Sequence, residues 1–416
     1  MILVIPPIYG LMRHLVFLEE LAKTDETDAN WRSTSAGLVV LRLVDHWMET
    51  GSTGGDSWGL AAVRDAVAEI EETTPVRRIL ASAVDAIAEA KPADISAVIP
   101  RLMAYAKSLE YDARWALAVD VYETILPHAD PVADADVVIT AHVQTSTCLR
   151  ALGDFDGALD ASRRAQEVAA AANDLSGQLR GRLVEGRVSI SRGNYPVAAS
   201  ICDEIIEASE RHGLLEMKSR ALQDRSGISG MTGEFEQAIQ FAYAALPNAA
   251  SERDREMILL SIATGFSELG VIDVARDAYL VVLATAQDQY VRWIAAMNMM
   301  EIAGRQRSEP VFDRYRRELA NVQLTSYLHA KFLILVGNGY LQFGRRELAI
   351  STLEEAIQYS REKGLNHLVF EAEAALAVAR SEARVSASET VGRVPDGIAS
   401  VAEAIREMRQ TADAGA

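Results

Sequence analysis

The sequence is poor in cysteine, in proline and in positive charge. Only two cysteines and eleven prolines occur in 416 residues, and 41 Lys and Arg stand against 59 Asp and Glu, which gives a formal net charge of −18. So little cysteine excludes a disulfide-rich scaffold. An acidic chain has no general attraction for nucleic-acid phosphates or anionic lipids. We therefore expect no nucleic-acid partner.

Long hydrophobic runs and targeting signals are also missing. No uninterrupted apolar stretch approaches the roughly 20 residues that span a bilayer. The first residues, MILVIPPIYG, are apolar but lack a cationic segment, and Pro6 and Pro7 interrupt them. We expect a cytoplasmic protein without membrane association. Cys148 and Cys202 are expected to be buried thiols on apolar helices, with a disulfide between them as the less favoured alternative.

The patterns of catalytic and metal-binding sites are absent as well. Seven histidines are scattered without metal-binding spacing. The glycine-rich stretch from Gly51 to Ser57 lacks the ending of a phosphate-binding loop. The stretch from Ser226 to Gly230 lacks the spacing of a nucleophile elbow, and its small residues are expected to allow close helix contact. We expect no cofactor, no metal and no enzymatic activity, although a site built from distant residues is an alternative.

The feature that organises the chain is a repeated pattern, clearest from Val336 to Ile357. Gly337 is a small residue where two helices can touch, Gly344 breaks the first helix, and Ala349 begins an apolar stripe on the next. This stretch predicts a helix, a tight turn and a second helix.

The same small, turn and alanine positions recur upstream. They are Ser146, Gly153 and Ala158; Gly186, Gly193 and Ala198; Ser226, Gly233 and Ala238; Ala263, Gly270 and Ala275; and, in a more divergent copy, Ala106, Ala113 and Ala118. The residue two after each turn is Trp115, Phe155, Tyr195, Phe235, Ile272 or Arg346. These post-turn residues follow one another at intervals of 40, 40, 40, 37 and 74 residues. The last interval is twice 37 and predicts a seventh, degraded copy near Glu309.

This pattern resembles a long-repeat variant, of about 37–40 residues, of the tetratricopeptide repeat family. The resemblance covers roughly Ile99 to Ser360. It implies an all-α, right-handed α-solenoid of stacked helix hairpins. It also implies that the post-turn aromatics pack between adjacent repeats rather than bind a ligand.

Three regions follow from this register. Residues 1–98 are expected to form an N-terminal helical capping region, or alternatively a partner-binding domain; residues 99–383 form the solenoid; residues 384–416 form a linker and a C-terminal amphipathic helix. The N-terminal helices are expected over Pro7–Ala22, over Trp31–Glu49, from a cap at Asp56 or Ser57 to about Glu72, and from Pro75 to about Ala90. Later helices are expected over Asn366–Ala383 and Ile398–Met408, separated by the linker Ser386–Gly397.

In the resembled family, the first helix of each repeat lines a concave groove, and its ligand-facing positions can be transferred to this sequence. For the copy at Phe235 they are Arg220, Gln223, Gly227, Gly230 and Met231. Over all copies, the resemblance implies a partner-binding groove that includes Lys107, Thr147, Arg150, Arg180, Arg187, Arg220, Gln223, Lys331 and Asn338. Six basic residues against two acidic ones, Glu110 and Glu268, would suit an acidic peptide or a C-terminal carboxylate. The alternative is that the arginines pair with acids on neighbouring helices and recognise nothing.

The resulting hypothesis is a non-enzymatic scaffold or adaptor that binds a protein or peptide in its groove. A regulator that responds to a peptide or small molecule is the first alternative, and an enzyme with a scattered site is the second. The sequence predicts neither the identity of the partner nor the oligomeric state.

Overall fold

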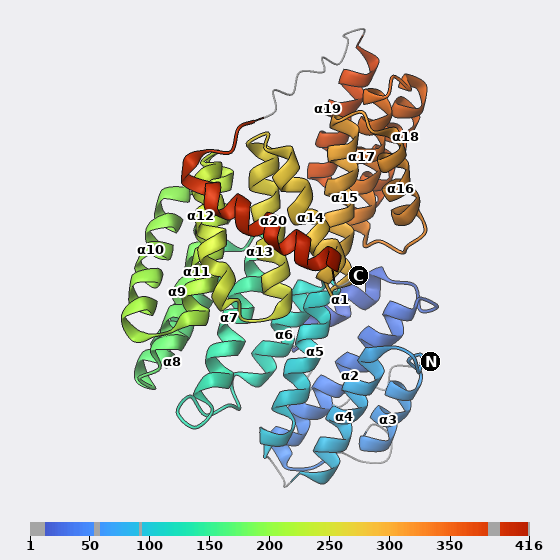
Figure 1. The fold of residues 1–416 in the computed structure, drawn as a ribbon. Helices are drawn as coiled ribbons and strands as arrows, with labels where there is room; N and C mark the ends of the chain where they lie inside the picture. The colour runs from blue at the N-terminus through green and yellow to red at the C-terminus, as the bar shows by residue number, and fades with distance from the viewer. Residues whose placement is uncertain (1–12, 54–58, 91–93, 382–391, 415–416) are drawn as a thin grey trace. The chain divides into compact units, whose positions relative to one another are not determined.

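The computed structural model of the chain describes residues 13–53, 59–90, 94–381 and 392–414. Regular structure within these ranges is helical throughout, without a strand, which confirms the predicted all-α class (Figure 1). The chain forms two compact units, Met1–Ile201 and Cys202–Ala416. We describe each unit by itself.

The first unit starts with four helices that precede the repeats. They are α1 (Leu15–Lys23), α2 (Ala29–Thr50), α3 (Leu60–Ala68) and α4 (Pro75–Glu89). A short 3-10 turn, η2 (Ile95–Ala97), leads into the repeat helices. These are α5 (Ile99–Tyr111), α6 (Trp115–Ile125), α7 (Ala135–Ala151), α8 (Phe155–Ala171) and α9 (Leu175–Ser191). The next helix, α10 (Tyr195–His212), contains the boundary between the units.

The N-terminal helices agree with the sequence where they are described. Asp28 caps α2 by accepting a hydrogen bond from the backbone N–H of Asn30, and Pro75 occupies the first turn of α4. Helix α3 ends at Ala68, before the predicted Glu72. The first part of the helix predicted from Pro7, and the predicted cap at Asp56 or Ser57, lie outside the described residues.

The second unit continues the hairpins and ends on an extra helix. Its helices are α11 (Leu215–Met231), α12 (Phe235–Ala245), η3 (Leu246–Asn248), α13 (Glu252–Glu268), α14 (Ile272–Thr285), α15 (Gln289–Arg305), α16 (Glu309–Ala320), α17 (Ser326–Gln342), α18 (Arg346–Glu362), α19 (Asn366–Arg380), η4 (Asp396–Ile398) and α20 (Ala399–Ala414). Helix α16 begins at Glu309, which confirms the degraded repeat predicted there; it is the sixth of seven hairpins in chain order. Part of the predicted linker, residues 386–391, lies outside the described residues.

All seven hairpins turn in the same way. The turn residues have positive φ, and they are Ala113, Gly153, Gly193, Gly233, Gly270, Arg307 and Gly344. In each turn, the backbone N–H of the following residue donates to the carbonyl five residues earlier at 2.8 or 2.9 Å, as from Asp154 to Leu149. This bond satisfies a carbonyl that the ending helix leaves free. Ala113 and Arg307 adopt the same conformation without glycine, so these two copies lack the turn glycine of the repeated pattern.

In two hairpins the small residue of the pattern bonds directly to the alanine position of the next helix. Ser146 Oγ donates to the backbone carbonyl of Ala158 at 2.7 Å, and Ser226 Oγ donates to that of Ala238 at 2.8 Å. The alanine is buried in all six copies recognised from the sequence. The periodicity therefore identified the helix–helix contact inside the hairpin.

The post-turn aromatics pack less deeply than a fully buried wedge between repeats would. Each is the first residue of its second helix, as the register requires, but Trp115, Phe155, Tyr195 and Phe235 are only half-buried. A residue at a helix start lies at the end of the hairpin, where solvent reaches one side of the ring. At Phe155, the guanidinium of Arg192 covers the ring from 5.5 Å. These aromatics therefore bury less area than wedges between repeats would.

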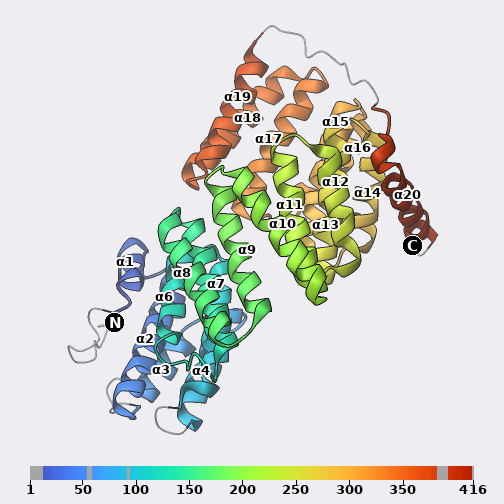
Figure 2. The ribbon, with the colours of Figure 1, turned by 90° about the vertical axis from the view of Figure 1, so that its left-hand side faces the viewer.

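Each of the two units has its own main apolar core. In the first unit, α1–α4 share one apolar cluster with α5–α7. In the second unit, the main cluster includes Ile398, Val401 and Ile405 of the C-terminal segment, which packs on α12 and α14 (Figures 1 and 2). The apolar face predicted for the C-terminal helix is thus a packing face. Met408 contributes to it while half-buried.

Two further expectations concern cysteines and membranes. Cys148 and Cys202 are both buried and form no disulfide, as expected. Burial, with a smaller contribution from the Glu110 carboxylate, raises the pKa of the Cys148 thiol to about 12.

No helix in the described part of the chain is long and apolar enough to cross a bilayer.

Candidate functional site

Several ligand-facing positions of the first helices in the first unit already have partners within the protein. Lys107 on α5 is exposed and forms an ion pair with Glu110, with 2.5 Å between Nζ and Oε2. Glu110 is itself buried and accepts a hydrogen bond from the Tyr122 hydroxyl at 2.5 Å. Glu110 therefore faces the hairpin interior rather than a ligand, and Lys107 partly neutralises it.

Arg180 on α9 is also engaged within the protein. Its guanidinium forms an ion pair with Asp136 on α7 at 3.0 Å and donates to Thr140 Oγ1 at 2.5 Å. The Arg180 side chain is 25% exposed, and Asp136 is 83% exposed. These contacts join the N-terminal ends of two neighbouring first helices. Here the structure favours the alternative in which an arginine pairs with a nearby acid.

The C-terminal ends of α7 and α9 are joined by another predicted residue. Arg150 Nη1 donates to Ser191 Oγ at 3.2 Å. Thr147 donates its hydroxyl to the carbonyl of Val143 at 3.0 Å, within its own helix. Arg150 and Arg187 are half-buried. The structure therefore brings Thr140, Arg150 and Arg180 onto the joined faces of α7 and α9.

In the second unit, the predicted groove residues of α17 are only partly available to a ligand. Lys331 Nζ forms an ion pair with Glu371 Oε1 on α19 at 2.6 Å. Asn338, two turns further along α17, is half-buried. Lys331 thus ties α17 to α19.

Helix α11 carries the least engaged set of predicted residues. Arg220 is exposed and makes no hydrogen bond or ion pair with the described residues. The Nε2 atom of Gln223 is buried and has no hydrogen-bond partner within the described ranges. Gly227 and Gly230 follow on the same helical face, at four and seven residues from Gln223. We call Arg220, Gln223, Gly227 and Gly230 the α11 strip. Helix α13 lies beside α11 (Figure 2).

The two glycines of the α11 strip correct the expectation that they allow close helix contact. A Cβ atom added at either one would meet nothing within 4 Å, whereas at Gly265 it would lie 2.6 Å from Ile239 Cγ1. The close contact is made instead by the buried Ser226, whose hydroxyl donates to the carbonyl of Ala238 on α12 at 2.8 Å. A glycine within a helix costs up to about 1 kcal/mol relative to alanine, and no packing here requires it.

A polar cluster that the sequence did not reveal lies near the start of the first unit. His14 is buried, and its Nδ1 lies 2.5 Å from Asp120 Oδ2 while its Nε2 lies 3.2 Å from Asp45 Oδ2. Burial alone lowers the pKa of His14, but the hydrogen bonds and charges of Asp120 and Asp45 outweigh it and raise the pKa to about 9. The ring is therefore an imidazolium clamped between two carboxylates.

This cluster borders a cavity of about 380 Å³. Arg13, 3.1 Å from Asp45, and His128 also line it. Both ring nitrogens of His14 are engaged, so neither is left to act as a general base. The cluster was missed because its members come from α2, α6 and the start of α1, and no short motif joins them. Such distant partners become visible only in the folded chain.

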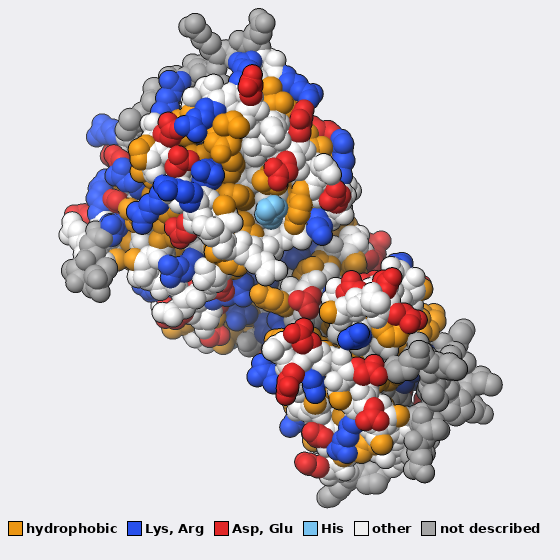
Figure 3. All heavy atoms as spheres, turned by 90° about the vertical axis from the view of Figure 1, so that its right-hand side faces the viewer, with side chains coloured by type: hydrophobic (Ala, Val, Ile, Leu, Met, Phe, Trp, Pro, Cys, Tyr) orange, Lys and Arg blue, Asp and Glu red, His pale blue; other side chains and the backbone are white. Residues whose placement is uncertain are grey.

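The described residues offer little for catalysis by a metal. No group of three or more His, Cys, Asp or Glu side chains within them is placed to hold a metal ion. Figure 3 shows one face of the molecule, on which Lys and Arg are interspersed with Asp and Glu without an extended field of one sign. Charge on this face therefore does not single out a site.

Comparisons with known proteins found similarity only among solved structures. No protein-family model matches the sequence, and no curated protein matches it. A crystal structure of a Rap protein complexed with competence and sporulation factor is 10% identical, with 84% of this chain and 98% of that chain covered and a TM-score of 0.46. The apo form of RapI is 11% identical, with 82% and 97% covered and a TM-score of 0.43. Similarity of this extent says nothing of what this chain binds.

Proposed function

We propose that this chain is a non-enzymatic scaffold or adaptor that binds a protein or peptide segment through the ligand-facing positions of its first helices. The observation that carries the proposal is the α11 strip. There, one helical face carries an exposed arginine, two open glycines and a buried amide group that has no hydrogen-bond partner among the described residues. The function needs no cofactor or metal.

The chemistry of the α11 strip suits an extended peptide. A buried polar group without a partner costs about 1–3 kcal/mol. The Gln223 side chain is half-buried, so a turn of it can bring Nε2 to a peptide carbonyl, and that hydrogen bond would remove the cost. Gly227 and Gly230 leave space for the backbone of a ligand to approach the helix. Arg220 can hold a carboxylate through two parallel hydrogen bonds. The favoured ligand is thus a peptide with an acidic side chain or a free C-terminus.

We also propose that the repeats belong to the tetratricopeptide family, as its long-repeat variant. Seven hairpins with one turn geometry and a buried alanine at a fixed place support this assignment. The positions of the α11 strip are the ones that the family would use for its ligand. The first unit offers fewer of them, because Arg180 and Lys107 already have acidic partners.

Selection of a displayed library of random peptides against the whole chain tests this function. We expect enrichment of acidic sequences, and we expect binding of the selected peptide to weaken as salt rises. Gly227→Leu should abolish binding by filling the open space, and Gln223→Ala should weaken it without loss of stability. Arg211→Glu, an exposed arginine on α10, is the matched control and should bind normally. A selected peptide that binds all of these variants equally would contradict the proposal.

A further inference from the structure

Helix α14 carries an apolar outer face that the later second helices lack. Its third and tenth residues, Val274 and Val281, lie seven positions apart and so on one side of the helix. Both valines are buried. The residues at the same two places in α16 and α18 are exposed, and they are Val311 and Glu318, and Leu348 and Glu355. The sequence of α14 is therefore suited to an outer face that another element covers.

Helix α20 is the element that packs on this face. Its apolar side, with Val401 and Ile405, and the preceding Ile398 are buried in the same apolar cluster as Val274 and Val281. Helix α20 contacts α14 along its length and also reaches α12 (Figure 1). The outer face of α14 and the inner face of α20 thus form one continuous piece of core.

The two helices also match in charge. Asp277 lies between Val274 and Val281 on the same side of α14, and it is half-buried. Burial raises the pKa of the Asp277 carboxyl, and the positive charges of Arg409 and Arg406 are among those that oppose the rise. Both arginines belong to α20. Packing of α20 therefore brings positive charge to an acid that would otherwise be covered without compensation.

The C-terminal segment, residues 392–414, holds two successive hairpins at once. Gln240 Nε2 on α12 donates to the carbonyl of Gly397 at 3.1 Å. The backbone N–H of Gly392 donates to the carbonyl of Gly270, the turn residue between α13 and α14, at 3.0 Å. A Cβ atom added at Gly392 would lie 2.5 Å from the carbonyl oxygen of Leu269, so this approach requires glycine. The segment therefore ties the hairpin α11–α12 to the hairpin α13–α14 (Figure 2).

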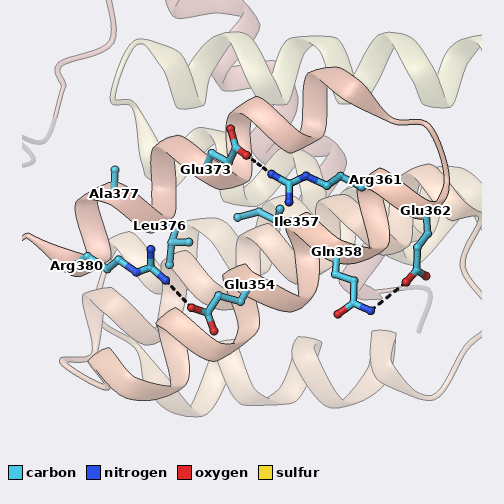
Figure 4. A pocket seen from close by; sticks show the side chains of 9 residues that line it. All are labelled: Glu354, Ile357, Gln358, Arg361, Glu362, Glu373, Leu376, Ala377 and Arg380. Atoms are coloured by element: carbon cyan, nitrogen blue, oxygen red, sulfur yellow. Dashed lines mark hydrogen bonds and ion pairs between the residues drawn. The ribbon is translucent and has the colours of Figure 1, made fainter.

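The other end of this connection is also attached to the repeats. Arg346 at the start of α18 donates to the carbonyl of Ser381, which directly follows α19. Ser381 and Gly392 are only eleven positions apart. Two ion pairs hold α19 on α18 (Figure 4), and they join Arg361 to Glu373 at 2.5 Å and Arg380 to Glu354 at 2.6 Å. A released α20 would therefore remain close to α14, which favours its return.

The outer position of α20 affects the inner side of the same hairpins. Each hairpin of a solenoid contacts mainly its neighbours, and the small rotation between them sets the curvature. When two packed hairpins rotate about their contact, their outer helices separate as their inner helices approach, or the reverse. A connection between α12 and α14 therefore restricts the spacing of α11 and α13, which flank the α11 strip.

We propose that α20 is a brace that fixes the spacing of α11 and α13 and thereby regulates access of a ligand to the α11 strip. The brace keeps the inner helices at one separation while it is packed on α14. Its release leaves them free to vary. The regulation of the α11 strip rests on the proposed peptide-binding function, whereas the effect on helix spacing does not.

Spin labels on the two inner helices test the brace. Both native cysteines are buried, so labels attach selectively to Glu216→Cys on α11 and Glu252→Cys on α13, which are exposed positions. Ile405→Glu should release α20 by placing a charge in its buried face. We expect a broader distribution of distances between the labels in this variant. Glu403→Ala, at an exposed position of α20, is the matched control and should keep the parent distribution.

Amide hydrogen exchange shows whether α20 has been released. An unchanged distance distribution in an Ile405→Glu variant whose α20 exchanges rapidly would overturn the proposal. If that variant unfolds the second unit, the labelled parent chain in mild urea replaces it, because the least stable segments open first. The distances should broaden when α20 loses protection while α11–α14 remain protected. Broadening only when α11–α14 also lose protection would count against the brace.

Peptide binding tests the regulation. A peptide selected on the parent chain should bind the Ile405→Glu variant at least about fivefold more weakly and the Glu403→Ala variant equally well. Because coupling is reciprocal, a saturating amount of the peptide should slow amide exchange in α20 of the parent. Equal affinities despite a broadened spacing would reject the regulation. A parent chain that selects no peptide would reject the proposed function instead, and the label distances would still decide whether α20 is a brace.

Discussion

Gly337 of α17 lies directly against Leu353 of α18. A Cβ atom added at Gly337 would lie 2.6 Å from Leu353 Cγ, and Leu353 is fully buried. The glycine therefore sets how closely the two helices of the seventh hairpin approach each other. Its position in the repeated pattern already indicated a helix contact, and the structure supplies the partner.

We predict that Gly337→Ala destabilises the second unit although alanine is the better helix former. Overpacking against Leu353 should cost about 1–3 kcal/mol, which exceeds the gain in helix propensity of up to about 1 kcal/mol. The matched control is Gly227→Ala, where the added methyl group meets open space. This change should only stabilise the helix, through the higher helix propensity of alanine. Urea unfolding of both variants measures the difference. Equal stabilisation by both changes would show that α17 and α18 can move apart freely.

The His14 cluster predicts a loss of stability at alkaline pH. The pKa of His14 is about 9 in the folded chain and 6.5 as its ordinary value. A raised folded-state pKa stabilises the fold fully below pH 6.5, and that contribution disappears as the pH rises through 9. The shift corresponds to roughly 3 kcal/mol at most. Urea unfolding followed by tryptophan fluorescence reports on this unit, because Trp31 and Trp47 lie in its core.

A second variant separates His14 from other groups that titrate at high pH. Asp120→Asn removes the shorter of the two carboxylate contacts of His14. Its stability should therefore be lower near neutral pH and should fall less steeply towards pH 9. A parallel decline in both proteins would assign the pH dependence to other groups.

The sequence predicted the hairpins well because their signals are local. A turn residue and the alanine five residues after it lie within one hairpin, and the helical period links them. The interval between repeats also predicted a copy near Glu309, where α16 begins. How far the post-turn aromatics are buried did not follow from the sequence, because solvent exposure at a hairpin end depends on neighbouring repeats. Phe155, for example, is covered on one face by Arg192 of the next hairpin.

The site was predictable only as a set of positions. The register placed Arg180 and Arg220 at equivalent places in successive repeats, but their surroundings differ. Arg180 has Asp136 within 3.0 Å, while Arg220 has no such neighbour in the described part of the chain. Which arginine is paired depends on residues 44 positions away, and so does not follow from a repeat pattern. The contact between His14 and Asp120 could not be predicted for the same reason, because the two residues are 106 positions apart.

The packing of α20 leads to a prediction about the C-terminal segment. Ile405 is fully buried in the core of the second unit. Ile405→Ala should cost about 2–5 kcal/mol of the free energy that holds α20 in place. We expect faster amide hydrogen exchange in α20 and in the α14 face beneath it. Glu403→Ala, at an exposed position on the same helix, should leave exchange unchanged. If amide hydrogen exchange in α20 stays slow in the Ile405→Ala variant, other contacts hold this helix in place.

The last prediction separates structural arginines from binding ones. Arg180→Glu places a carboxylate beside Asp136 and removes the hydrogen bond to Thr140, so it should lower stability by about 1 kcal/mol. Arg220→Glu alters an exposed residue without a partner among the described ones, and its stability should stay within about 0.5 kcal/mol of the parent. Thermal melting of the two variants compares them directly.

Binding should rank the same two variants in the opposite order. Arg220→Glu should abolish capture of an acidic peptide, because the carboxylate it introduces repels the ligand at an open position. Arg180→Glu should retain most of the binding, since Arg180 is held by Asp136 before any ligand arrives. If Arg220→Glu unfolds the chain, this arginine has a structural role. If Arg220→Glu folds and captures the peptide normally, the α11 strip is not the binding surface.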